Sequence, residues 1–104
     1  MQNSKDLLQK LADCIAACEN CSDACLEEDD VKAMASCIKT DRDCAEICST
    51  TYRLVARNSD NSSDMLKLCA DICRKCAEEC EQHDMQHCQD CANACRECEE
   101  ACRK

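Results

Sequence analysis

Apolar positions recur along this chain at the spacing of an α-helix. In residues 4–28 they are Leu7, Leu11, Cys14, Cys18, Cys21 and Cys25, in steps of four and three residues. Residues three or four apart lie on one face of a helix, so this segment is predicted to bury one stripe and expose the rest. Later segments repeat the pattern. The sequence therefore predicts four helices, over residues 4–28, 31–57, 64–82 and 84–103.

Polar segments separate these helices. The acidic run at residues 27–30 precedes the second helix, and Asp29 or Asp30 is expected to cap it. Residues 58–63 are all Asn, Ser or Asp, which favour turns. The third break is less marked, because the chain has no glycine or proline. A single helix from Ser63 onward would span roughly 60 Å, which is long for a small domain, so a turn is placed at residues 82–84.

Four amphipathic helices joined by short breaks predict an all-α fold, an antiparallel four-helix bundle forming a single domain over residues 1–104. One end of this bundle is expected to be closed by aliphatic side chains, those of Leu7, Leu8, Leu11, Val55, Met65 and Leu66. The opposite end collects Met34, His83, Met85 and His87. Tyr52, the one aromatic residue, is expected at the closed end or at an oligomer contact.

Cysteine occupies most of the inward positions, where a bundle normally carries leucine. The chain has 16 cysteines: Cys14, Cys18, Cys21, Cys25, Cys37, Cys44, Cys48, Cys69, Cys73, Cys76, Cys80, Cys88, Cys91, Cys95, Cys98 and Cys102. Many are four residues apart, which places their Cβ atoms about 5–6 Å from one another on a helix. Two such sulfurs can converge on one ion, and thiolate selects soft metals such as Cu(I) and Zn. We therefore predict a Cys-lined lumen in which all 16 cysteines are metal ligands.

Charge favours Cu(I) in that lumen. Sixteen thiolates with about four Zn²⁺ ions in four-cysteine sites would leave about eight negative charges buried, which is costly. Monovalent Cu(I) shared between two sulfurs approaches neutrality at one ion per thiolate. Two alternatives stay open at this point: sequestration of another thiophilic metal such as Zn or Cd, and a structural bundle stapled by disulfides. A thiol-redox enzyme is not expected, since its CxxC motif commonly accompanies strands and no strand pattern is present.

The second helix departs from the pattern. It has only three cysteines, and Asp41 stands in the inward register between Cys37 and Cys44. A carboxylate there is either a hard-oxygen defect in a soft lining or a residue that turns outward, and we interpret Asp41 as the latter, a solvated or capping residue.

Net charge and the absence of long apolar runs limit the partners. A net charge of −9 argues against nucleic acid and against an anionic membrane surface. The sequence shows no targeting segment and no run of membrane-spanning length. A cytoplasmic protein with reduced thiols is the expectation.

The repeated CxxxC and CxxC spacings and the stretch CEQHDMQHCQDC at residues 80–91 resemble the bacterial copper storage proteins, over essentially the whole chain. The resemblance implies storage of multiple Cu(I) ions in the lumen of a helical bundle assembled as a homotetramer. It also implies that histidine and methionine at the open end guide copper, which points to Met34, His83, Met85 and His87 as the entry site. Because Asp41 replaces a cysteine, the expected capacity is at or below one ion per cysteine.

Overall fold

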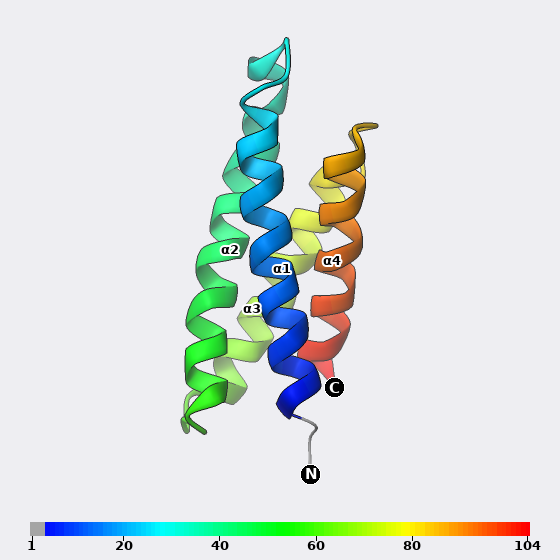
Figure 1. Cartoon of the computed structure of the whole chain (residues 1–104). Coiled ribbons are helices and arrows are strands. Elements are labelled where there is room, and N and C mark those ends of the chain that lie inside the picture. Colours follow the sequence, from blue (N-terminus) through cyan, green and yellow to red (C-terminus); the bar gives the residue numbers. More distant parts are fainter. Residues whose placement is uncertain (1–3) are drawn as a thin grey trace.

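Four long helices run up and down the molecule, as the sequence predicts for an all-α antiparallel bundle (Figure 1). The structure is a computed structural model that describes residues 4–104. Its helices are α1 (Ser4–Cys25), α2 (Ala35–Ala56), α3 (Ser62–Cys80) and α4 (Gln86–Arg103), and the short 3₁₀ helix η1 (Val31–Met34) leads directly into α2.

Each helix packs against two neighbours. Helices α1 and α3 each contact both α2 and α4, so the four form a square around one central axis. The bundle measures 46 × 17 × 17 Å. Both termini lie at one end, and the α1–η1–α2 hairpin extends beyond α3 and α4 at the other (Figure 1).

Polar residues and the local backbone end the helices, because glycine is absent. After Cys25 the amides of residues 26–28 bond three residues back, which stops α1 earlier than the sequence suggests. Asp30 accepts a hydrogen bond from the amide of Ala33 at 3.3 Å and so caps η1. Asn58 ends α2 with a φ of 55°, a left-handed conformation that asparagine tolerates better than most residues. Residues 81–85 separate α3 from α4, and the turn expected at 82–84 lies within this break.

Aliphatic side chains gather at the end of the bundle that holds the termini. Leu7, Leu11 and Val55 are buried there, and Leu66 packs half-buried against them; we call this the aliphatic end. The opposite end, where the α3–α4 turn carries His83 and His87, is the histidine end. Between the two ends the core is formed almost entirely by cysteine and alanine. In the described range, no helix is both long and apolar enough to cross a membrane.

Candidate metal centre

All 16 cysteines are buried, free thiols that point into the space enclosed by the four helices. The four-three spacing places four on α1, three on α2, four on α3 and five on α4, each on the stripe that faces the axis. Within residues 4–104 no disulfide joins any pair of them. The lumen is therefore lined largely by sulfur.

Sulfurs from different helices touch across this lumen. The Sγ of Cys14 lies 3.8 Å from that of Cys44 and 3.8 Å from that of Cys95, which links α1 to α2 and to α4. Further along the axis, Cys48 Sγ lies 3.6 Å from Cys69 Sγ on α3. These are van der Waals contacts between thiols, and small shifts of the side chains would admit a metal ion between them.

Groups of four ligand atoms overlap along the axis. In each group the ligand atoms lie within 4.8 Å of one another, and the groups include Cys14/Cys44/Cys48/Cys73, Cys14/Cys18/Cys44/Cys95, Cys18/Cys76/Cys91/Cys95 and Cys48/Cys69/Cys73/Cys98. Successive groups share members, so one sulfur can bridge two ions. Such an arrangement suits a chain of linked metal–thiolate clusters better than a set of isolated tetrahedral sites.

His87 belongs to one of these groups, at the histidine end. Its Nδ1 lies 3.3 Å from Cys21 Sγ and 3.5 Å from Cys88 Sγ, and Cys25 completes the group. Its Nε2 lies 2.9 Å from a carboxylate oxygen of Glu28. A carboxylate accepts the Nε2 proton, which leaves the lone pair of the neutral ring on Nδ1, facing the thiols. In this orientation Nδ1 of His87 could serve as a nitrogen ligand beside these thiols.

The other three residues expected at the entry site occupy different environments. His83 Nε2 lies 2.9 Å from Glu79 Oε2, one helical turn back, and the ring is half-buried. Met34 is almost fully buried at the start of α2, and Met85 is half-buried against the core just before α4. All three lie close in sequence to lumen cysteines, and His87 is the residue of the four whose ring nitrogen lies within 3.5 Å of two lumen thiols.

Asp41 lies inside the lumen, so our interpretation of it as an outward-turned residue is wrong. It is 0% exposed, and its Oδ1 accepts hydrogen bonds from the thiols of Cys76 at 3.2 Å and Cys91 at 3.3 Å. Cys80 also donates to Oδ1, at 3.5 Å. These donors satisfy the buried carboxyl group, which is why the inward register holds at this position.

Burial changes the acidity of groups in the lumen. Desolvation, followed by the nearby thiols of Cys91 and Cys37, raises the pKa of Asp41 to about 8. Desolvation is also the main cause that raises the pKa of Cys88 to about 12, with Cys37 the next contributor. Asp41 and Cys88 are thus mostly protonated in the metal-free protein near neutral pH. A metal that binds thiolate must displace the thiol proton.

The carboxylates beside the two histidines were not predicted. Glu79 stands four residues before His83, a helical spacing that the sequence could have flagged. Glu28, in the turn between α1 and α2, pairs with His87 of α4, 59 residues away in sequence, and no local pattern indicates such a pair.

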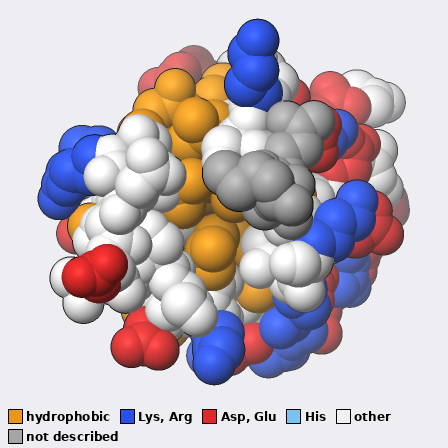
Figure 2. All heavy atoms as spheres, turned by 90° about the horizontal axis from the view of Figure 1, so that it is seen from below, with side chains coloured by type: hydrophobic (Ala, Val, Ile, Leu, Met, Phe, Trp, Pro, Cys, Tyr) orange, Lys and Arg blue, Asp and Glu red, His pale blue; other side chains and the backbone are white. Residues whose placement is uncertain are grey.

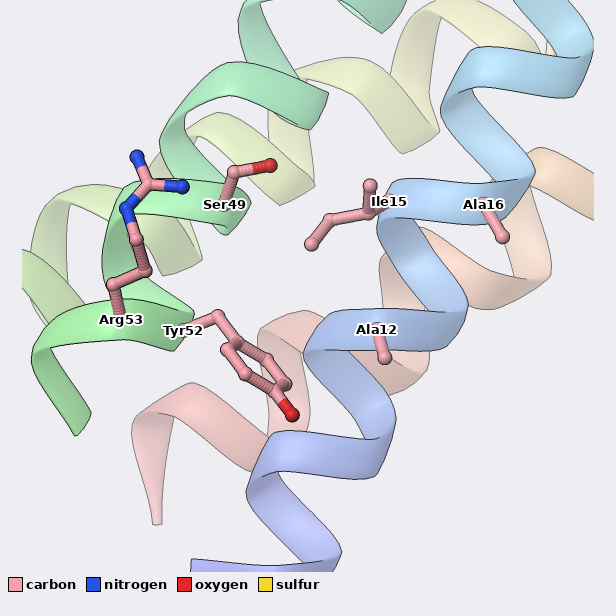
Figure 3. A pocket seen from close by; sticks show the side chains of 6 residues that line it. All are labelled: Ala12, Ile15, Ala16, Ser49, Tyr52 and Arg53. Atoms are coloured by element: carbon pink, nitrogen blue, oxygen red, sulfur yellow. The ribbon is translucent and has the colours of Figure 1, made fainter. Parts of the chain in front are cut away.

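Tyr52 borders an apolar surface groove. Figure 3 shows this groove between α1 and α2, with Tyr52 pointing toward α1 and Ile15 toward α2. Its volume is about 320 Å³, and Ala12, Ala16, Ser49 and Arg53 complete its lining. None of these six side chains is a soft metal ligand, so the groove is separate from the metal centre.

Comparison with known proteins assigns this architecture to a family. A family model described as copper storage protein matches residues 1–104. The uncharacterized cysteine-rich protein YhjQ of Bacillus subtilis (strain 168) is 41% identical over 88 residues, which are 85% of this chain and 82% of that protein.

Solved structures of copper storage proteins also resemble this chain. The Cu(I)-bound copper storage protein BsCsp3 is 41% identical with a TM-score of 0.93, over 96% of this chain and 94% of that chain. A cytosolic copper storage protein from Streptomyces lividans, in a structure with five coppers, is 37% identical with a TM-score of 0.93, over 96% of this chain and 88% of that one.

Proposed function

This chain belongs to the copper storage protein family, and we propose that it stores multiple Cu(I) ions on the thiolates of its lumen, without catalytic turnover. The observation that supports the proposal most is the overlap of the four-sulfur groups along the axis. Shared sulfurs allow neighbouring ions to be bridged, so the number of ions can approach the number of cysteines. We assign all 16 cysteines as ligands.

The charge of the filled lumen favours Cu(I) over a divalent ion. One Cu(I) per thiolate leaves a nearly neutral core, whereas tetrahedral Zn²⁺ sites leave surplus negative charge in a buried space. Asp41 adds a hard oxygen among soft ligands near the middle of the sulfur lining. Its presence places the expected capacity at or below one ion per cysteine.

Copper is proposed to enter at the histidine end. His87 offers Nδ1 beside Cys21 and Cys88, so a Cu(I) ion arriving there meets one nitrogen and two sulfurs. His83, Met85 and Met34 are assigned lesser roles in the same entry site. A cytoplasmic location fits this function, because Cu(I)–thiolate storage requires reduced cysteines.

The assembly is proposed to be a homotetramer. The groove bordered by Tyr52 gives the α1–α2 face an apolar surface, and Tyr52 is 37% exposed in the single chain. Light scattering should give four times the mass of the chain, and Tyr52→Glu should lower that mass while Tyr52→Phe should not. A monomer mass for the unaltered protein at micromolar concentration would contradict the assembly.

An anaerobic titration tests the storage function. Fully reduced protein is titrated with Cu(I) against a competing chelator of known affinity, with far-UV circular dichroism followed in parallel. We expect saturation at a dozen or more ions per chain and a spectrum that is already helical without metal. Binding that stops after a few ions, or a preference for about four Zn²⁺ over Cu(I) in a parallel titration, would refute storage of Cu(I).

A further inference from the structure

The stripe of cysteines comes closest to the surface at the aliphatic end. Cys102, the last cysteine of α4, is 8% exposed, whereas every other cysteine is 0% exposed. Its thiol lies against those of Cys69 and Cys98, and both of these belong to a four-sulfur group of the lumen. Cys102 is therefore the cysteine that lies nearest to solvent.

A cavity of about 550 Å³ opens onto Cys102. Leu66 and Ala70 of α3 form its apolar wall, and the basic side chains Lys67, Arg103 and Lys104 line it as well. No carboxylate side chain is among the described residues that line it. Figure 2 looks onto this end of the bundle, where hydrophobic side chains are visible between the helices and charged side chains surround them.

The basic lining is unusual for this protein. The chain has a net charge of −9, and its other end places Glu28 and Glu79 beside the histidines. Arg103 is paired with Asp71 at 3.2 Å and Glu99 at 3.1 Å, and Lys67 and Lys104 add positive charge to the same lining. A cavity lined by both a cysteine and cationic side chains suits an anionic ligand that carries a soft donor atom.

We propose that this cavity is a second copper exchange site, where Cys102 passes Cu(I) to an anionic low-molecular-weight thiol. The proposal rests on the storage function proposed above and adds an outlet to it. A volume of this size accommodates a ligand of small-peptide dimensions. A thiol is a soft donor that can displace a thiolate from Cu(I), and the cationic lining favours the anionic members of that class.

The transfer is a ligand exchange without change of oxidation state. The sulfur of the incoming thiol forms a bond to a Cu(I) ion held by Cys102, and the bond from that ion to Cys102 Sγ breaks. The proton lost by the incoming thiol ends on the Cys102 thiol. Copper stays Cu(I) throughout, and ions deeper in the lumen shift along the shared sulfurs to refill the position.

Extraction kinetics test the proposal. The Cu(I)-loaded protein is mixed anaerobically at low salt with glutathione, an anionic thiol, or with uncharged 2-mercaptoethanol, and the copper remaining on the protein is followed. Lys67→Glu should slow extraction by glutathione about fivefold, an effect of the size expected for local charge, and should leave extraction by 2-mercaptoethanol unchanged. The matched control is Lys75→Glu, also exposed on α3 and about 12 Å further along the helix, outside the cavity.

A pair of thiol variants tests the role of Cys102 itself. Cys102→Ser and Cys25→Ser each remove one lumen sulfur, from opposite ends, so both should lower capacity by about one ion. Cys102→Ser should slow extraction by both thiols more than Cys25→Ser does. The inference is overturned if Lys67→Glu and Lys75→Glu behave alike with glutathione, or if Cys25→Ser slows extraction as much as Cys102→Ser.

The two proposals can fail separately. The number of ions bound is measured before extraction, so a protein that holds only a few Cu(I) ions refutes storage itself. A protein that fills normally but releases copper independently of Lys67 and Cys102 refutes only the second exchange site. Because Lys67 is exposed, its variant decides the matter even if Cys102→Ser does not fold.

Discussion

Asp41 occupies the position in α2 where the register of the other helices would place a cysteine. A carboxyl group in a sulfur-lined core would normally be expensive, but three thiols donate to its oxygen. The helical periodicity predicted that Asp41 faces inward. We set this prediction aside because a carboxylate is a hard ligand, and the resulting interpretation was wrong. The lesson at this position is that hydrogen-bond donors in the core, which a sequence does not show, decide whether a polar residue is buried.

The raised pKa of Asp41 predicts that the stability of the metal-free protein depends on pH. Its pKa is raised to about 8 in the folded chain, against about 3.9 when unfolded. Between these values the folded chain holds a proton that the unfolded chain has lost. The stabilisation is therefore full below about pH 4 and is lost as the pH rises through about 8, with a slope of at most about 1.4 kcal/mol per pH unit.

Urea denaturation of the metal-free protein between about pH 5 and 7.5 measures this effect below the range in which unfolded thiols ionise. The unaltered protein should lose stability as the pH rises, and Asp41→Asn should be less dependent on pH. Parallel curves for the two proteins would show that Asp41 does not hold the proton.

Single serine substitutions in the middle of the lumen test the assignment of its cysteines. Cys73 and Cys95 are 0% exposed and each belongs to overlapping sulfur groups. Replacing either by serine should lower the Cu(I) capacity by about one ion, because serine is a poor ligand for a soft metal, and should leave the helices intact. Copper quantification and far-UV circular dichroism check this. Unfolding of the metal-free variant would instead favour a structural role for these cysteines.

At the scale of the helices, periodicity gave the faces more accurately than the ends. The four-three register placed every cysteine on the buried side of its helix, since burial repeats with the helical turn. The start of the first helix and the end of the last agree with the prediction, and the other ends shifted by one to four residues, because they depend on backbone bonds such as those after Cys25 and on the 3₁₀ turn before α2. The pairing of Glu28 with His87 required the three-dimensional arrangement of α1 and α4.

The aliphatic end should contribute much of the stability of the metal-free bundle. Leu11 on α1 is fully buried and is among the largest side chains in a core otherwise built of small thiols. Leu11→Ala should reduce the free energy of unfolding by about 2–5 kcal/mol, as large-to-small changes do in packed cores. The matched control is Leu8, which is half-buried and lies beside the inward-facing stripe of α1. Chemical denaturation should show a clearly smaller loss for Leu8→Ala, and equal losses would mean that the end is loosely packed.

For the whole molecule, the comparisons confirm both the fold and the family that the cysteine pattern suggested. The pattern was informative because one residue type was repeated on every helix and its spacing fixed a common direction. It could not locate the opening at Cys102, which depends on how completely aliphatic side chains from three helices meet.

The affinity of the protein for Cu(I) should fall as the pH is lowered. Burial keeps thiols such as Cys88 protonated in the metal-free state, so each ion that binds must release protons. Competition titrations at decreasing pH should show the apparent affinity for Cu(I) falling, after correction for protonation of the chelator. An affinity independent of pH would mean that the ions are not bound by sulfurs that were protonated beforehand.

The contacts between sulfurs of different helices also expose the empty protein to damage. Cys48 and Cys69 touch at 3.6 Å, and Cys37 and Cys80 at 3.7 Å, so a two-electron oxidant needs only small side-chain movements to couple either pair. Each coupling consumes two ligands and ties two helices together, whereas a thiolate already bound to metal is not available to react. The metal-free bundle would thus lose free thiols two at a time under oxidising conditions. Its remaining capacity for Cu(I) would fall with the time that it spends without metal.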